Sequence, residues 1–252
     1  LFRSIPLNPL ARLVTPDGKT GPEAIRRTTH LGIGAHQDDL EFMAFHGILA
    51  CYDRDDRWFG GVTITDGRGS SRAGQFKDWT DDQIAAERIR EQEAAAVIGQ
   101  YSFIAQLGHG SAAVRDARQT TVRDDLRAIL EAARPEVVYL HNLADKHDTH
   151  VGCALRCLEA MRLMPGVETE IALTNTLGIR ADIPAGEITL DTLFNAMPFD
   201  NTVTTMFLSG REVQELLDFA TSRSTDRGCQ SQIQVAGIRF TMNCAEGVAQ
   251  DI

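Results

Sequence analysis

Short apolar runs alternate with amphipathic stretches over the first 165 residues of the chain. The runs are rich in glycine and β-branched residues and show no helical period, so they predict buried parallel strands. They span residues 30–35, 59–65, 101–107 and 136–141. Helical patterns lie between and after them, at residues 40–52, 81–100, 122–133 and 149–163. Strand–helix alternation of this kind predicts a doubly wound sheet with helices on both faces.

The pattern changes at Pro165 and Gly166, which end a helix. Shorter elements follow: strands at 170–175, 202–208 and 232–243, and helices at 189–197 and 210–220. We therefore predict an α/β protein with a Rossmann-like parallel sheet in residues 1–165, followed by a smaller α/β (α+β) segment in residues 166–252. We expect strand 170–175 to pair beside 136–141, and Leu216, Leu217 and Phe219 to lie in a core.

Composition excludes several classes of partner. The chain has 252 residues, 43% hydrophobic and 24% charged, with a formal net charge of −10. An acidic chain is poorly suited to nucleic acid or to an anionic membrane surface. The apolar runs end well before the ~20 residues that a membrane helix needs. Residues 1–29 lack the apolar core of a signal peptide, so we interpret them as a surface arm and expect a cytoplasmic protein.

The five cysteines do not suggest a disulfide framework. They are Cys51, Cys153, Cys157, Cys229 and Cys244. Their number is odd and no pair has CxxC spacing, so a reducing compartment is the simpler interpretation. Cys153 and Cys157 lie one helical turn apart and are expected to pack rather than to bond.

Histidine and aspartate gather in two loops that follow predicted strands. The first loop is AHQDDLE, residues 35–41, and the second is HNLADKHDTHVG, residues 141–152. Ligands of open parallel sheets bind at the carboxyl ends of the strands, so both loops should meet at one edge. Two histidines and one carboxylate can hold zinc and leave a position for water, whose pKa the metal lowers toward ~7.

These two loops supply all the parts of such a site. His36 and Asp39 are candidate ligands from the first loop and His150 is the candidate from the second. Asp38 and His147 remain for proton transfer.

Each motif also has a simpler interpretation. Asp38 or Asp39 could cap the helix at Leu40, and Asp148 could cap the helix at Thr149. The occurrence of both motifs at the same predicted edge favours the metal site. Among the other histidines, His46 is expected to be packed or at the surface, and His141 to lie near the site without being a ligand. His30 and His109 have no partner motif.

Residues 30 to about 164 resemble the PIG-L/LmbE-like family of zinc-dependent N-deacetylases. The first family motif, AHPDD, stands here as residues 35–39, with Gln37 in place of proline, and the HxxH motif stands as residues 147–150. The resemblance implies Zn²⁺, or another divalent metal, on His36, Asp39 and His150. It implies Asp38 as general base and His147 as general acid or oxyanion partner.

Residues 169–243 instead resemble the C-terminal domain of 5'-nucleotidases. The runs IALTNTLGIRADIPAGEITLDTLFNAMPFDNTV, LSGREVQELLD and QVAGIRFT carry this resemblance. It implies nucleotide contacts at Asn175, Arg180 and Phe199. Thr176, Leu177 and Asp200 depart from the family pattern, and Phe199 read without the resemblance is a core aromatic residue.

Together these features predict a metal-dependent hydrolase that removes an N-acyl group from a small N-acetylglucosamine-type sugar or conjugate. The alternative functions are a nucleotide-binding fragment and an interaction protein without catalysis. Because the deacetylase-like part ends near residue 164, we expect a site that binds metal but turns over weakly or not at all.

Overall fold

The computed structural model describes residues 7–143, 145–165, 172–175, 179–181, 189–199 and 203–252. The chain divides into two compact units. The first unit consists of residues 1–165 and 200–206, and the second of residues 166–199 and 207–252. A short segment from beyond residue 199 therefore belongs to the first unit.

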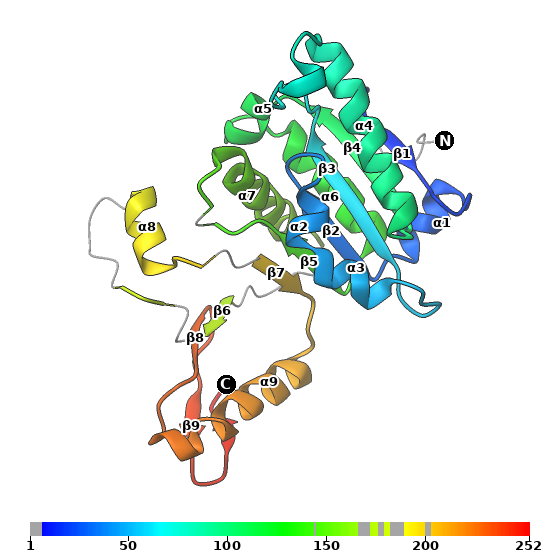
Figure 1. The fold of residues 1–252 in the computed structure, drawn as a ribbon. Coiled ribbons are helices and arrows are strands. Elements are labelled where there is room, and N and C mark those ends of the chain that lie inside the picture. Colours follow the sequence, from blue (N-terminus) through cyan, green and yellow to red (C-terminus); the bar gives the residue numbers. More distant parts are fainter. Residues whose placement is uncertain (1–6, 144, 166–171, 176–178, 182–188, 200–202) are drawn as a thin grey trace. The chain divides into compact units, whose positions relative to one another are not determined.

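The first unit is a sheet flanked by helices (Figure 1). Its strands are β1 (Arg12–Val14), β2 (His30–Gly34), β3 (Phe59–Thr65), β4 (Phe103–His109), β5 (Val137–Leu140) and β7 (Val203–Met206). Its helices are α1 (Gly21–Arg26), α2 (Asp39–Met43), α3 (Phe45–Cys51), α4 (Asp81–Ile98), α5 (Ser111–Arg115), α6 (Thr121–Ala133) and α7 (Asp148–Arg162), with a short 3-10 helix at Gly74–Phe76.

The sheet has the order β1-β4-β3-β2-β5-β7. The four inner strands run parallel, whereas β1 and β7 pair antiparallel at the two edges. The predicted α/β class is confirmed, with the four predicted strands at the centre of the sheet. The prediction that residues 170–175 extend this sheet is wrong, because β7 takes the place beside β5.

Helices cover both faces of the sheet (Figure 1). On one face Leu40, Ala44 and Ile48 from the α2–α3 region pack with Phe59 and Tyr101 in a buried cluster. Helices α6 and α7 pack against each other, and α7 contacts β2. Every residue of β2 and β3 is buried, as expected for strands covered on both sides. The carboxyl ends of these strands are therefore held rigidly where the loops begin.

Three local predictions need correction in the first unit. The arm at residues 1–29 contributes an edge strand and a helix, β1 and α1, to the fold. The predicted helix 40–52 is interrupted at Ala44, whose φ of −111° and ψ of 15° separate α2 from α3. Helix α5 lies in a stretch for which no element was predicted. Helix α4 begins with a capping box, which Thr80 and Gln83 form.

In its described residues, the second unit contains small antiparallel pairs and two α-helices. Strand β6 (Ala172–Asn175) pairs with β8 (Ile233–Ala236), and β9 (Thr241–Asn243) pairs with β10 (Val248–Gln250). Its helices are α8 (Leu190–Ala196) and α9 (Gly210–Ser222), with a 3-10 helix at Thr225–Arg227. The long predicted strand 232–243 is divided at Gly237, whose φ of 81° favours glycine and breaks the extended backbone.

Helix α9 fulfils the core prediction only in part. Leu217 is buried, Leu216 is partly buried and Phe219 is 66% exposed. Ser209 and Glu212 form a capping box at its start, and Gln214 donates a hydrogen bond to the carbonyl of Ala249 on β10. The helix therefore packs by one narrow face, and the prediction for Phe219 is wrong.

Cys229 and Cys244 form a disulfide, so the expectation that the chain has none is wrong. The odd total misled the sequence interpretation because the remaining three cysteines belong to the other unit. Cys51, Cys153 and Cys157 are free and buried there, and burial raises their pKa values. The packing predicted for Cys153 and Cys157 is confirmed. The number of cysteines therefore no longer supports a reducing compartment.

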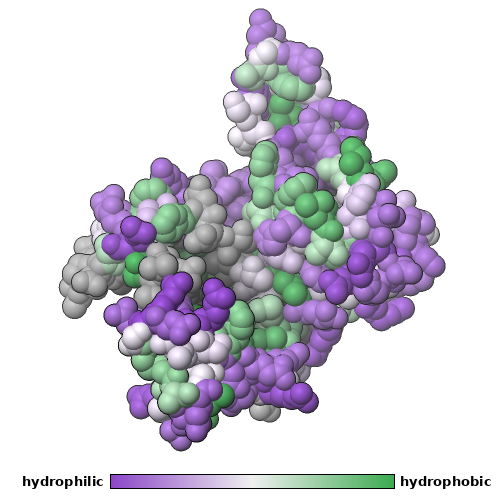
Figure 2. Space-filling model, turned by 60° about the horizontal axis from the view of Figure 1, so that its bottom comes forward, coloured by the Kyte–Doolittle hydropathy of each residue, from purple (hydrophilic) through white to green (hydrophobic). Residues whose placement is uncertain are grey.

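The surface is mainly hydrophilic on the face that Figure 2 shows, with hydrophobic residues in separate small groups. Large exposed apolar side chains on α2, α3 and the turn after α3 are Phe42, Phe45, Leu49 and Tyr52. No helix in the described part of the chain combines the length and the apolar character needed to cross a bilayer.

Candidate metal centre

The order of the strands defines where a ligand should bind. The chain passes from β2 to β3 and β4 on one side, and then returns to place β5 on the other side of β2. The carboxyl ends of β2 and β5 therefore flank the switch point of the sheet, the usual binding crevice in open α/β folds. The loop with His36 and Asp39 follows β2, and the loop that leads to His150 follows β5.

The structure brings His36, Asp39 and His150 into one cluster. His36 Nδ1 lies 3.2 Å from His150 Nε2 and 3.4 Å from Asp39 Oδ2, and His150 Nε2 lies 3.5 Å from Asp39 Oδ1. Ligand atoms of a tetrahedral zinc ion at 2.0–2.1 Å would be roughly 3.3–3.4 Å from one another. The spacing of the three groups therefore fits a small divalent cation held between them.

Asp39 is fixed by its place at the start of α2. Its Oδ2 accepts a hydrogen bond of 2.6 Å from the backbone N–H of His36. A Cβ at Gly34 would lie 2.9 Å from the Cβ of Asp39, so only glycine at the end of β2 permits this approach. Burial alone would raise the pKa of Asp39, but contacts with His141 and His36 outweigh it and hold the pKa well below its usual range. The carboxylate is therefore ionised, as a metal ligand must be.

His150 is oriented by a carboxylate that sequence analysis missed. Its Nδ1 lies 3.0 Å from Asp145 Oδ2, on the side of the ring away from His36. A neutral imidazole that donates Nδ1–H to Asp145 keeps a lone pair on Nε2, which faces His36 and Asp39. Burial and the neighbouring His141 lower the pKa of His150, which favours the neutral form that binds metal.

His141 lies next to this cluster. Its Nε2 is 3.1 Å from Asp39 Oδ2, and the backbone N–H of Ala35 points at the same nitrogen from 3.0 Å. Its ring stacks on that of His150 with centroids 4.0 Å apart. A second group of potential ligands thus consists of Asp39, His141 and His150. A third consists of His36, His147 and His150. His141 differs from the others in being buried.

Asp38 sits at an unusual backbone position between the two ligands of the first loop. Its φ is 84°, a left-handed conformation that aspartate tolerates better than most residues. Its backbone N–H donates to Gln92 Oε1, and its Oδ2 lies 2.8 Å from Arg88 Nη2. Arg88 also donates to the carbonyl of Gln37. Helix α4 therefore holds the loop from outside, while Asp38 Oδ1 makes no hydrogen bond among the described residues.

His147 caps the helix that carries His150. Its Nδ1 accepts a hydrogen bond of 3.3 Å from the backbone N–H of Thr149. A neutral ring in this arrangement carries its proton on Nε2. Its centroid lies 4.9 Å from that of His36, so the ring stands at the edge of the cluster. The geometry leaves His147 able to donate a proton toward the space beside His36.

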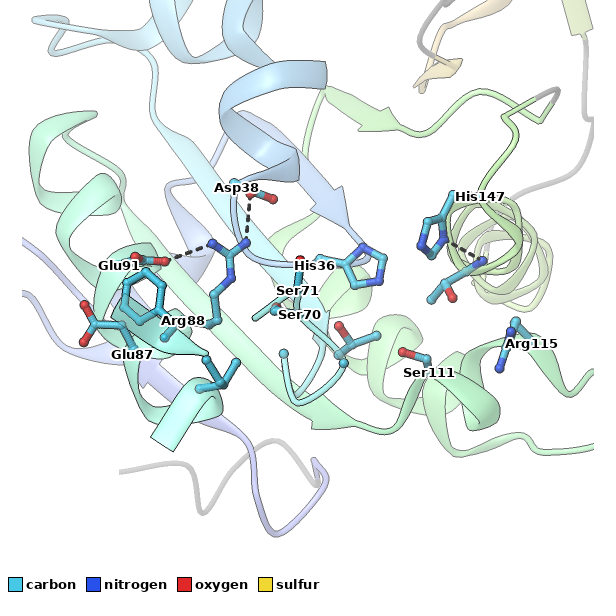
Figure 3. Close-up of a pocket in the computed structure, with 16 residues that line it drawn as sticks. His36, Asp38, Ser70, Ser71, Glu87, Arg88, Glu91, Ser111, Arg115 and His147 are labelled. Atoms are coloured by element: carbon cyan, nitrogen blue, oxygen red, sulfur yellow. Dashed lines mark hydrogen bonds and ion pairs between the residues drawn. The ribbon is translucent and has the colours of Figure 1, made fainter. Parts of the chain in front are cut away.

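A cavity of about 600 Å³ opens onto this cluster (Figure 3). His36, Asp38 and His147 line it, together with residues of α4, α5 and the loop after β3. The polar residues that contribute from those elements are Ser70, Ser71, Glu87, Arg88, Glu91, Ser111 and Arg115. A volume of this size lies within the range of pockets that bind small molecules.

Two supporting residues were not predicted from the sequence. Asp145 could have been found, because histidine ligands usually donate their second N–H to a nearby carboxylate, and Asp145 lies in the same loop. Arg88 could not, since the sequence of helix α4 gives no sign that Arg88 faces the loop at Gln37 and Asp38.

Asp145→Asn is expected to weaken zinc binding by about 10- to 100-fold, because the amide provides a weaker acceptor for His150 Nδ1–H. Zinc affinity can be measured by competition with a chromophoric chelator. Asp148→Asn is the matched control, since it removes an exposed carboxylate from the same loop. Equal affinities for the two variants would show that Asp145 does not position His150.

Comparisons with protein families support this description of the first unit. Residues 31–161 match the family model of GlcNAc-PI de-N-acetylase (PIG-L), more than half of the chain. The chain therefore belongs to the GlcNAc-PI de-N-acetylase family. Residues 132–252 match the model of the 5'-nucleotidase C-terminal domain, so the two matches overlap around β5 and α7.

The curated relatives match short stretches of the chain. The trifunctional nucleotide phosphoesterase protein YfkN of Bacillus subtilis is 44% identical over 71 residues, 28% of this chain and 5% of its own length. A 5'-nucleotidase of Vibrio cholerae is 31% identical over 93 residues, 37% of this chain and 16% of its own. An apyrase of Tabanus yao is 32% identical over 84 residues, 32% of this chain and 15% of its own. The chain thus spans only a small fraction of these proteins.

Two solved structures are distantly similar. N,N'-diacetylchitobiose deacetylase from Pyrococcus horikoshii is 21% identical with a TM-score of 0.46, over 55% of this chain and 51% of that one. The 4-carboxy-2-hydroxymuconate hydratase GalB from Pseudomonas putida is 18% identical with a TM-score of 0.44, over 86% of this chain and 99% of that one. Both scores are low, and neither likeness bears on the function of this chain.

Proposed function

We propose that the chain is a zinc-dependent hydrolase that removes an acetyl group from the amide of an N-acetylglucosamine-type sugar or conjugate. The observation that carries this proposal is the convergence of His36 Nδ1, His150 Nε2 and the Asp39 carboxylate at separations of 3.2–3.5 Å. Membership of a de-N-acetylase family supplies the type of reaction.

Two histidines and one carboxylate form a donor set that zinc prefers among common divalent ions, although other divalent metals accept the same groups. Zinc supplies a Lewis acid for the amide carbonyl and activates water for attack. The residues around it would hold the ion and orient the substrate. Asp145 keeps His150 in the required tautomer.

Asp38 is proposed as the general base. Its Oδ2 is paired with Arg88, which leaves Oδ1 to accept a proton from the attacking water. The pairing holds the carboxylate at the cavity. Arg88 is itself balanced by Glu91, 2.9 Å away, so it does not bind Asp38 as an isolated charge.

His147 is proposed as the general acid. Its Nδ1 is occupied by the N–H of Thr149, so Nε2 carries the transferable proton. From that position it can stabilise negative charge on the carbonyl oxygen and then protonate the departing amine. Base and acid would thus act from the two loops that the sheet brings together.

Acetate release from N-acetylglucosamine glycosides tests this proposal. The full chain should release acetate when loaded with zinc, lose that activity when a chelator strips the metal, and regain it when zinc is restored. Failure of zinc to restore any release above that of the stripped protein would contradict the proposal. The expected weak turnover, well below the 1 s⁻¹ or more of typical enzymes, is measured in the same assay.

A second candidate function is nucleotide contact by the second unit. Arg180 Cζ lies 5.8 Å from the ring centroid of Phe199, which is 44% exposed, and the Arg180 N–H donates to the carbonyl of Ala196. The two predicted residues are thus neighbours, while the side chain of Asn175 lies outside the described part of the chain. A base that stacks on the same face of Phe199 as Arg180 would displace the guanidinium. Calorimetric titration with adenosine and AMP tests this function independently of zinc.

A further inference from the structure

Helix α5 forms one wall of the cavity. Ser111 and Arg115 are four residues apart, so they lie on the same face of the helix, and both line the cavity with His147 and Thr149. Figure 3 shows them on the side of His147, away from Arg88. No function assigned above uses either residue.

The place of α5 is fixed by a close contact with α7. A Cβ at Gly152 would lie 2.9 Å from the carbonyl oxygen of Val114, so glycine is required for the two helices to approach this closely. Val114 is itself fully buried. The contact lies two residues beyond His150 on the same helix. The backbone at Arg115 is therefore held at a fixed position relative to the helix that carries His150.

Arg115 has no carboxylate partner among the residues that the structure describes. The adjacent Asp116 accepts two hydrogen bonds from the guanidinium of Arg118, which lowers its pKa to about 2. The other arginine of the cavity, Arg88, is paired with Asp38 and Glu91. Arg115 is thus the cavity cation whose charge is left for a ligand.

The carboxylates of the cavity lie on the side opposite to α5. Glu87 and Glu91 line it from α4, beside Arg88 (Figure 3). Carboxylates accept hydrogen bonds from sugar hydroxyls, whereas a guanidinium binds phosphate or carboxylate oxygens. The two walls of the cavity therefore differ in charge, because α4 presents hydrogen-bond acceptors and α5 presents a cation. The His/Asp cluster lies between the two walls.

We propose that Arg115, with the hydroxyl of Ser111, forms a subsite for an anionic oxygen group carried by the N-acylated sugar substrate. The inference rests on the proposed function, because the metal site places the amide between the two walls. A phosphate and a carboxylate share the required chemistry. The sugar hydroxyls would face Glu87 and Glu91, and the anionic substituent would face α5.

The experiment compares three substrates of the zinc-loaded chain: the methyl glycoside of N-acetylglucosamine, its carboxymethyl glycoside and its 1-phosphate. We expect kcat/KM for at least one anionic substrate to exceed that for the methyl glycoside by roughly 10- to 100-fold, as for a charge-assisted hydrogen bond. Which of the two is preferred identifies the anion as carboxylate or phosphate.

Arg115→Gln should reduce this ratio of kcat/KM values to near one. Arg115→Lys should keep part of the preference, because an ammonium supplies the charge without the bidentate geometry. Arg118→Gln is the matched control: it removes an arginine three residues away that is paired with Asp116, and it should leave the ratio unchanged. Calorimetric titration of the same sugars into each variant gives a second reading that does not depend on turnover.

The outcomes separate the inference from the function on which it rests. Hydrolysis of the methyl glycoside without any preference for an anion, or a preference that survives in Arg115→Gln, overturns the subsite and leaves the deacetylase proposal intact. If no sugar is hydrolysed, the deacetylase proposal fails. The calorimetric comparison then decides the subsite: weaker anion binding by Arg115→Gln supports it, and equal binding overturns it.

Discussion

His36→Ala is expected to remove bound zinc and, with it, acetate release. Two remaining protein ligands, Asp39 and His150, fall short of the three that catalytic zinc sites use. Metal content measured by mass spectrometry should fall from close to one zinc per chain to background, and hydrolysis should fall to the level of the chelator-stripped protein.

The matched control for His36→Ala is His46→Ala. His46 is an exposed histidine on α3, where its ring contacts Tyr139 with centroids 4.9 Å apart. The His46→Ala variant should therefore keep its zinc. If His36→Ala also retains a full complement of metal, another group, such as Asp39 with His141 and His150, must hold the ion.

Asp38→Asn is expected to keep zinc and to lose activity by about 10²–10⁴-fold, the usual contribution of a general base. The amide cannot accept the proton, but it has nearly the same shape and occupies the same left-handed position, which asparagine also tolerates. The measurements are zinc content and the single-turnover rate of acetate release.

Glu91→Gln separates the loss of a base from the loss of an Arg88 partner. It removes the second carboxylate paired with Arg88 but leaves Asp38 unchanged. We expect it to lower the rate far less than Asp38→Asn. A similar loss in both variants would show that the charge balance of Arg88, and not proton transfer by Asp38, governs the rate.

The centre of the fold was accessible from the sequence because its signals are local. The runs at β2 and β3 consist mainly of glycine and apolar residues, as is typical of strands covered on both faces. The motifs of the candidate site follow β2 and β5 directly, so a rule about strand ends was sufficient to place them at one edge. The chemistry of these motifs stays a prediction, because ligand geometry alone does not show turnover.

The errors concern interactions between distant segments. Strands β6 (residues 172–175) and β7 (residues 203–206) both have four residues, and no local pattern decides which of them pairs with β5. Counting cysteines over the whole chain obscured the pair formed by Cys229 and Cys244 within one unit. Arg88 acts through tertiary contacts with Gln37 and Asp38, which the spacing of residues in the sequence does not reveal.

The pairing of β7 with β5 has a consequence for synthesis of the protein. Leu140 pairs with Val203, and Val137 pairs with Met206. This edge of the sheet therefore stays open until residues 203–206 have been synthesised. At translation rates of 5–20 residues per second, the intervening stretch of about 60 residues keeps the edge open for roughly 3–12 seconds. During that time the nascent chain offers unpaired backbone groups beside its completed strands, so protection by a chaperone would matter most in this interval.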